Sequence, residues 1–174
     1  MKTKRCFLFV VPLMLLWVGY ALSYAQNADP VCTALQKMIP SLQRQTKVPV
    51  RLPVSVCEKL FTSADGPLYA VLNEVNKNGY SVTIGYSTDC NGAAACRYAS
   101  IDADQSGENS MPFKEAKTKI VLANHITGYL FDSKGCATGC NTAIEWQQNG
   151  VFYTVGIKYG NVKDVLAMAN AMVR

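Results

Sequence analysis

Cysteine spacing constrains this chain more than any other feature. Six of its seven cysteines follow an N-terminal segment with the features of an export signal, and such signals lead to compartments where disulfides form. Four of the six make two closely spaced couples. The glycines and alanines inside each couple let the backbone bend enough to join the side chains. Short-range pairing leaves the two upstream cysteines for each other, so the expected disulfides are Cys32–Cys57, Cys90–Cys96 and Cys136–Cys140.

Two other roles for the cysteines stay open. The four later cysteines could form a zinc site, and the Cys136-x-x-x-Cys140 couple could form a redox pair. Export disfavours the zinc site, because thiolates rarely stay free in an oxidising compartment. The redox pair lacks the Cys-x-x-Cys spacing and the βαβ pattern of thioredoxin-like proteins.

The export signal is predicted at residues 1–25. Three basic residues within the first five positions precede the apolar run Cys6–Val18. Ser23-Tyr24-Ala25 then places small residues at the −3 and −1 positions of a cleavage site. The run is shorter than the roughly 20 apolar residues of a bilayer span, although an uncleaved anchor remains the alternative. No later segment is long and apolar enough to cross a membrane. We expect cleavage after Ala25 and a mature protein that is periplasmic or released.

Residues 26–174 are expected to form a single domain, because 149 residues match the size of one ordinary domain. The signal holds three basic residues and no acidic one, so its removal lowers the formal net charge from +5 to +2. A nucleic-acid partner would require a clustered basic surface, and the remaining charge argues against one. No motif implies a cofactor. The expected partner is an unidentified protein or small ligand outside the cytoplasm.

Two Asn-Gly dipeptides predict β-hairpins. Asn149-Gly150 accepts the positive φ that both positions of a type I′ turn need, and pairing around it places Trp146 opposite Tyr153. Register and hydrophobic alternation then agree along residues 143–159.

Asn78-Gly79 predicts the second hairpin. Pairing around this dipeptide sets Val75 opposite Val82 and Val71 opposite Tyr86. In this register the apolar residues of both strands, Tyr69 among them, lie on the same face of the hairpin.

Further strands are predicted on either side of these hairpins. Residues 48–56 are apolar at every even position, and the prolines at positions 49 and 53 favour a sheet edge. Residues 97–102, 119–123 and 126–131 also read as strands, and Asn124-His125 would form the tight turn between the last two.

A helix is predicted near each end of the chain. Asp29 can cap the first helix and Pro30 suits its first turn. Asn161 and Asp164 make a capping pair for the last helix. The predicted fold class is therefore α+β: an antiparallel, meandering sheet of about six to eight strands, stapled by disulfides, with helices packed on one face.

Several motifs lie between residues 46 and 172: Val48–Pro53, Cys90–Cys96, Val121–Asn124, Gly128-Tyr129, Gly135-Cys136 with Cys140, and Ile144-Glu145-Trp146 through Tyr153. Together they resemble an uncharacterised family of small secreted bacterial proteins. The Val-Pro-x-x-Leu-Pro segment and the Trp-Tyr hairpin also resemble a domain of bacterial extracytoplasmic sensor and anti-sigma proteins. Neither resemblance implies catalytic residues. The family pattern has four cysteines, and Cys32 and Cys57 are additions to it, which agrees with their pairing together.

Three sets of residues are candidates for chemistry. His125 is the chain's single histidine and could act as the base of a hydrolase, although a turn histidine with no catalytic role is the plainer interpretation. Glu145, Gln147 and Thr154 alternate with apolar residues and predict a polar outer stripe, which is either solvated strand surface or a ligand surface.

The third set resembles the start of a calcium loop. Oxygen ligands recur at alternate positions and a glycine follows, but Phe113 stands where such a loop needs its glutamate. A charged turn after a strand is the plainer interpretation. The candidate calcium ligands are Asp102, Asp104, Ser106 and Glu108.

The sequence thus favours an exported, non-enzymatic domain that binds a ligand or protein in the cell envelope or medium. A small secreted hydrolase that uses His125 and a calcium-stabilised structural domain remain the alternatives.

Overall fold

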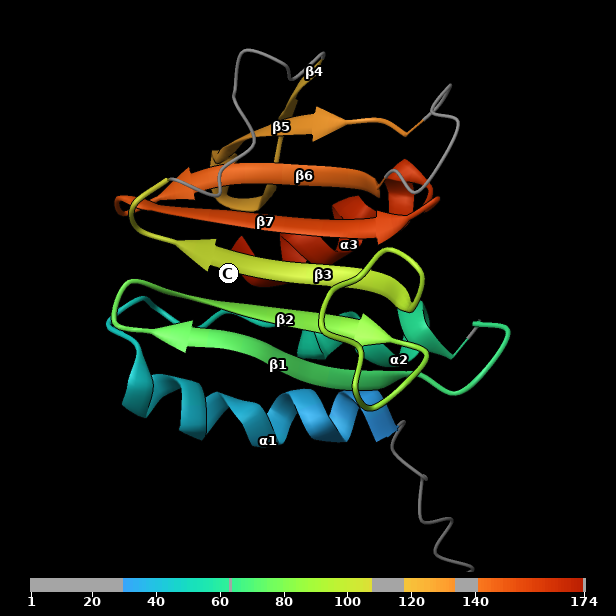
Figure 1. The fold of residues 1–174 in the computed structure, drawn as a ribbon. Coiled ribbons are helices and arrows are strands. Elements are labelled where there is room, and N and C mark those ends of the chain that lie inside the picture. Colours follow the sequence, from blue (N-terminus) through green and yellow to red (C-terminus); the bar gives the residue numbers. More distant parts are fainter. Residues whose placement is uncertain (1–29, 63, 108–117, 134–140, 174) are drawn as a thin grey trace, which may run out of the picture.

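The computed structural model describes residues 30–62, 64–107, 118–133 and 141–173. Within them, seven strands form one antiparallel sheet in the order β1-β2-β3-β7-β6-β5-β4 (Figure 1). The strands are β1 Tyr69–Asn76, β2 Gly79–Gly85, β3 Arg97–Asp104, β4 Thr118–Val121, β5 Thr127–Phe131, β6 Asn141–Gln148 and β7 Val151–Lys158. The helices are α1 Pro30–Gln45, α2 Cys57–Phe61 and α3 Val162–Val173, with 3-10 turns η1 Val54–Val56 and η2 Ala123–His125.

The strand order is not the simple meander that the sequence predicts. The chain runs β1-β2-β3, moves to the far edge for β4, and returns through β5 and β6, so that β7 lies between β3 and β6. The first and last strands of the sheet order are therefore β1 and β4. All neighbouring strands pair antiparallel, as predicted.

The hairpin around Asn149-Gly150 is confirmed. Asn149 has φ 55° and Gly150 has φ 77°, the left-handed conformations of a type I′ turn. The register sets Trp146 opposite Tyr153, and their rings stack with centroids 5.5 Å apart. The predicted turn at Asn124-His125 is also present, with positive φ at both residues.

The first hairpin exists, but its register differs from the prediction. The turn residues are Lys77 and Asn78, and Gly79 is already paired with Asn76. A bulge between Leu72 and Glu74 then shifts the pairing again. The bulge reverses the alternation, so Tyr69 and its neighbour Val71 lie on the face opposite to Tyr80 and Val82, and the prediction for them was wrong.

The predicted strand at residues 48–56 is wrong. The segment begins at a bend, has no regular secondary structure up to Pro53 and then forms η1, which α2 follows directly. Tyrosine hydroxyls from the sheet take the place of a partner strand: Tyr80 Oη donates to the Arg51 carbonyl at 2.8 Å and accepts from the Arg51 amide at 2.9 Å, and Tyr153 Oη donates to the Pro49 carbonyl at 3.0 Å.

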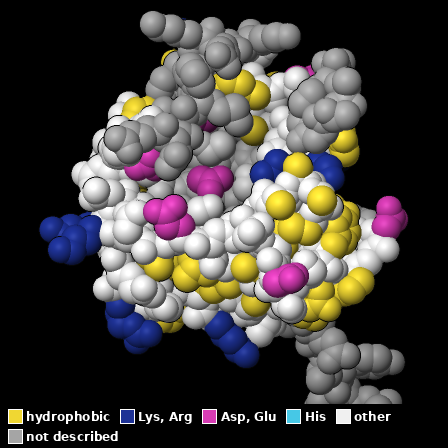
Figure 2. Space-filling view, in the orientation of Figure 1, with side chains coloured by type: hydrophobic (Ala, Val, Ile, Leu, Met, Phe, Trp, Pro, Cys, Tyr) yellow, Lys and Arg dark blue, Asp and Glu magenta, His cyan; other side chains and the backbone are white. Residues whose placement is uncertain are grey.

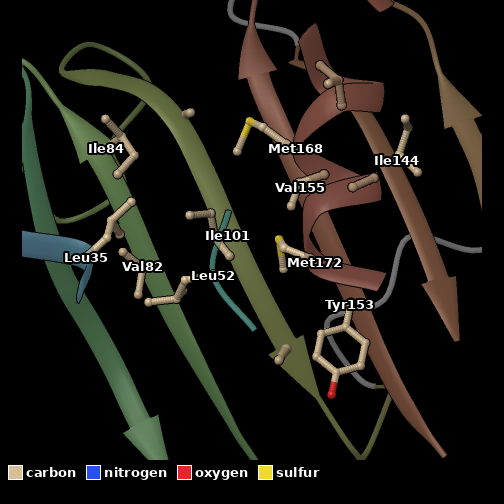
Figure 3. Packing of buried hydrophobic residues seen from close by; sticks show 14 of the residues in the cluster. Leu35, Leu52, Val82, Ile84, Ile101, Ile144, Tyr153, Val155, Met168 and Met172 are labelled. Carbon is tan, nitrogen blue, oxygen red and sulfur yellow. The ribbon is translucent and has the colours of Figure 1, made fainter. Parts of the chain in front are cut away.

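The helices bury one face of the sheet. Figure 1 shows α2 and α3 behind the strands and α1 beside β1. Met168 and Met172 of α3 pack over Val155 and Tyr153 of β7 (Figure 3). Asn161 caps α3 as predicted, because its Oδ1 accepts from the Asp164 amide at 2.9 Å. Asp29, the predicted cap of α1, lies outside the described residues.

Two predicted disulfides are present. Cys32–Cys57 joins α1 to α2 with its Cα atoms 5.6 Å apart, and Cys90–Cys96 closes a loop after β2 with its Cα atoms 5.7 Å apart. Cys136 and Cys140 lie outside the described residues, as does the predicted signal.

Candidate functional site

A row of polar side chains crosses the sheet face that the described helices leave open. Ser81, Asp102 and Thr154 point to this face, and the strand register sets each one opposite the next. Glu145 continues the row on β6 and Tyr129 continues it on β5. The row places one carboxyl group on each side of Thr154: Asp102 on β3 and Glu145 on β6.

A groove with a volume of about 840 Å³ lies at one end of this row, over β1, β2, β3 and the turn between β1 and β2. Figure 2 shows acidic side chains gathered left of the middle of this face, with basic side chains at its left and lower edges and a further basic group just right of the middle. Carboxylates, hydroxyls and amides dominate the lining, so the groove offers both hydrogen-bond donors and acceptors, with three carboxyl groups against one ammonium group. Its polar lining residues are Glu74, Asn76, Lys77, Asn78, Ser81, Asp102, Asp104 and Ser106.

Asp102 is the carboxyl group that the groove shares with the row. Ser81 Oγ donates to Asp102 Oδ1 at 2.6 Å. Burial raises the pKa of Asp102 above its ordinary value of 3.8, while hydrogen bonds from Ser81 and Ser100 and the charge of Arg97 oppose that rise. Asp102 therefore stands in an environment that disfavours its negative charge when the groove holds no cation.

Glu145 is not part of a solvated surface, contrary to the plainer of the two expectations. Its side chain is fully buried, and Thr154 Oγ1 donates to its Oε2 at 3.2 Å. Gln147 lies on the same face but is exposed. The predicted stripe thus splits into a hydrogen-bonded pair, the buried Glu145 with the half-buried Thr154, and the exposed amide of Gln147.

The residues of the possible calcium loop are only partly brought together. Asp102 and Asp104 point to the same face of β3, but Asp104 accepts hydrogen bonds from the Ser106 amide and hydroxyl at 2.8 Å. These bonds describe a local turn. Across the described ranges, no three His, Cys, Asp or Glu side chains form a group that could hold a metal ion. Glu108 lies outside those ranges, and calcium binding stays a prediction.

His125 lies far from the groove. It is exposed on the turn between β4 and β5, at the opposite side of the strand order from β1. Strands are spaced by about 4.8 Å, which puts β5 roughly 19 Å from β2. The structure does not bring His125 together with Asp102.

Sequence reasoning did not single out Ser81 or Glu74. Ser81 alternates with the buried residues Tyr80 and Val82, so a period-two pattern carried the signal that could have found it. Glu74 could not be placed, because it follows the bulge in β1.

Within the part of the chain that the structure describes, no helix is both long and apolar enough to span a membrane. No family model, curated protein or solved structure matches this chain, so the resemblance to small secreted bacterial proteins stays a prediction.

Proposed function

We propose that this protein is an exported, non-enzymatic binding domain that holds its ligand in the groove over β1, β2 and β3. The observation that carries the proposal is the groove itself: a hollow of about 840 Å³ on the helix-free face, with the half-buried carboxyl group of Asp102 in its lining. Binding sites are typically concave and carry a few converging polar groups. The two disulfides agree with export, because disulfides are typical of oxidising compartments.

The chemistry of the lining favours a positively charged ligand. Glu74, Asp102 and Asp104 contribute three carboxyl groups, and Lys77 contributes one ammonium group. A cation near Asp102 would favour the charged carboxylate that burial disfavours. The partner that fits is therefore a ligand or peptide segment that presents ammonium or guanidinium groups.

The hydrolase alternative has less support. A base must come within hydrogen-bond reach of the group from which it takes a proton. His125 and the groove lie several strands apart in the sheet, so one small substrate cannot contact both.

A titration followed by NMR tests the proposal. We expect a tetralysine peptide to shift the amide signals of Ser81, Asp102 and Asp104, and its side-chain-acetylated form, which lacks the charges, to leave them unchanged. Asp102→Asn should weaken binding by about tenfold, the effect of losing one charge-assisted hydrogen bond. Asp65→Asn makes the same charge change at an exposed residue outside the groove and should leave the affinity unchanged.

Two results would contradict the proposal. Shifts confined to other surfaces would place binding elsewhere, and equal binding of the charged and acetylated peptides would remove the electrostatic argument. Export is tested separately by N-terminal sequencing of native protein, which should begin at Gln26. A native protein that begins at Met1 with free thiols would contradict it.

A further inference from the structure

We propose that the loop closed by Cys90–Cys96 is a redox-controlled cover over the helix-free face, and that reduction of this disulfide uncovers a second part of that face beside the groove. The effect on ligands rests on the proposed function, whereas the movement of the cover does not.

The loop lies over Thr83, which Asn73 of β1 also contacts, because Asn73 Nδ2 donates to Thr83 Oγ1 at 2.5 Å. Thr83 belongs to the helix-free face, because its neighbours Val82 and Ile84 point to the helices. Its exposed fraction is nevertheless only 1%. Gly92 lies above it: a Cβ atom at Gly92 would be 3.5 Å from Thr83 Oγ1 and 3.4 Å from Asn73 Nδ2. The backbone of the loop thus helps to shield Thr83.

Hydrogen bonds hold the loop besides the disulfide. At its C-terminal end, the Tyr86 amide donates to the Cys96 carbonyl at 2.9 Å, and the Ala93 carbonyl accepts from the Cys96 and Arg97 amides at 3.2 and 3.1 Å. Arg97 Nη1 donates to the Gly92 carbonyl at 2.9 Å, and Lys158 Nζ donates to the Ala94 carbonyl at 2.7 Å. The side chains of Asn91 and of residues 93–95 are exposed, so they bury little apolar surface. Without the disulfide, the backbone bonds at Ala93 and Cys96 and the two hydrogen bonds from flexible cationic side chains remain to oppose the gain in chain entropy.

The two described disulfides differ in accessibility. Cys90 is buried, but its partner Cys96 is only half-buried. Cys32 and Cys57 are both buried in the hydrophobic core, to which Cys90 does not belong. Thiol–disulfide exchange needs access to a sulfur atom, so a reductant should reach Cys96 before it reaches either core sulfur.

The reductant that fits is a dithiol. One of its thiolates attacks Cys96 Sγ, forms a mixed disulfide and breaks the Cys90–Cys96 bond, and the electron pair leaves on Cys90, which takes up a proton. The second thiolate of the reductant then attacks the reductant's other sulfur atom, which is bonded to Cys96 Sγ in the mixed disulfide. The reductant leaves as a cyclic disulfide, Cys96 leaves as a thiol, and the protein has gained two electrons and two protons.

Opening would lengthen the polar surface along β2 and β3. Thr83 pairs with Ser100 in the row next to that of Ser81 and Asp102. Both rows would then face solvent, and Arg97 and Lys158 would lose their carbonyl partners. The cover would thus change both the length and the charge of the surface next to the groove.

Methyl NMR with a soluble gadolinium chelate tests the cover in the absence of ligand. Mild dithiothreitol should give two alkylatable thiols at Cys90 and Cys96 before any at Cys32 or Cys57. We then expect the chelate to enhance relaxation of the Thr83 methyl group several-fold, while relaxation of the core Val155 and the half-buried Thr154 methyl groups does not change. Cys90→Ala with Cys96→Ala should give the same result without reductant.

Each other outcome overturns the proposal. A Thr83 methyl group that stays protected in both the reduced protein and the double variant would show that the disulfide does not hold the cover. Exposure of the Val155 methyl group in both would show that the disulfide staples the fold instead. The tetralysine titration, repeated on the double variant, should extend the shifts to Ser100. If neither form binds the peptide, the proposed function fails while the relaxation result still decides the cover.

Discussion

Asp102 is a residue whose protonation links the groove to stability. Burial raises its pKa above 3.8, so the folded state binds this proton more tightly than the unfolded state does. Between 3.8 and the raised value, the free energy of unfolding falls as pH rises. We expect Asp102→Asn to be more stable than the native protein at about pH 7, and the difference to vanish as pH falls below 3.8. Urea unfolding across this pH range measures the effect.

Asp65→Asn is the matched control, because Asp65 is exposed and its substitution makes the same change in charge. It should give no pH-dependent gain. If Asp102→Asn lost stability at neutral pH, the hydrogen bond from Ser81 would outweigh the burial of the charge.

For single residues, the sequence pattern predicted which face of the sheet a side chain occupies, but not how deeply the side chain is buried. Alternation correctly put Glu145 and Thr154 on one face of their hairpin. It could not foresee that Glu145 is fully buried. A period of two tells which way a side chain points, and says nothing of what lies over it.

The cap of α3 carries the prediction at the scale of the elements. Asn161 Oδ1 accepts from the Asp164 amide at 2.9 Å and satisfies a backbone donor that the helix leaves open. Asn161→Ala should lower the free energy of unfolding by about 1 kcal/mol. Asn161→Ser should lower it much less, because serine also caps the helix. Urea denaturation compares the two variants. Equal losses would mean that the side-chain acceptor is not what stabilises this end of the helix.

Turns that depend on their own residues could be predicted from the sequence. Segments whose conformation depends on residues far away in the sequence could not. The turns at Asn149-Gly150 and Asn124-His125 follow from residues that accept positive φ. The first hairpin turns at Lys77-Asn78 because Gly79 is taken up by pairing with Asn76, and the bulge in β1 then shifts the pairing again. The segment at residues 48–56 was misread because the hydroxyl groups of Tyr80 and Tyr153, distant in sequence, satisfy its carbonyls.

At the scale of the whole molecule, the strand order decides which candidate residues can act together. The antiparallel sheet and its two terminal helices followed from periodicity, but the position of β7 between β3 and β6 did not. Pairing between distant strands depends on the packing of the complete sheet, which local patterns do not encode. This order places Asp102 near Glu145 and leaves His125 at the far side.

The two described disulfides should also differ in what they contribute to the whole molecule. Cys32–Cys57 ties α1 to α2 inside the core and spans 25 residues, whereas Cys90–Cys96 spans six residues on the open face. On the chain-entropy model, removing the first costs about 3.5 kcal/mol and removing the second about 2 kcal/mol. Cys32→Ala with Cys57→Ala should therefore lower Tm by on the order of 10 °C, and more than the Cys90→Ala, Cys96→Ala pair does.

Calorimetry on both double variants makes the comparison under identical conditions. The larger loss is expected for the core pair also because shortening two buried side chains leaves space in the close-packed interior. If the Cys90–Cys96 variant melted lower instead, the surface loop would be part of what holds the sheet together. It would then be wrong to assign stabilisation of the fold to the core disulfide and control of access to the helix-free face to the outer disulfide.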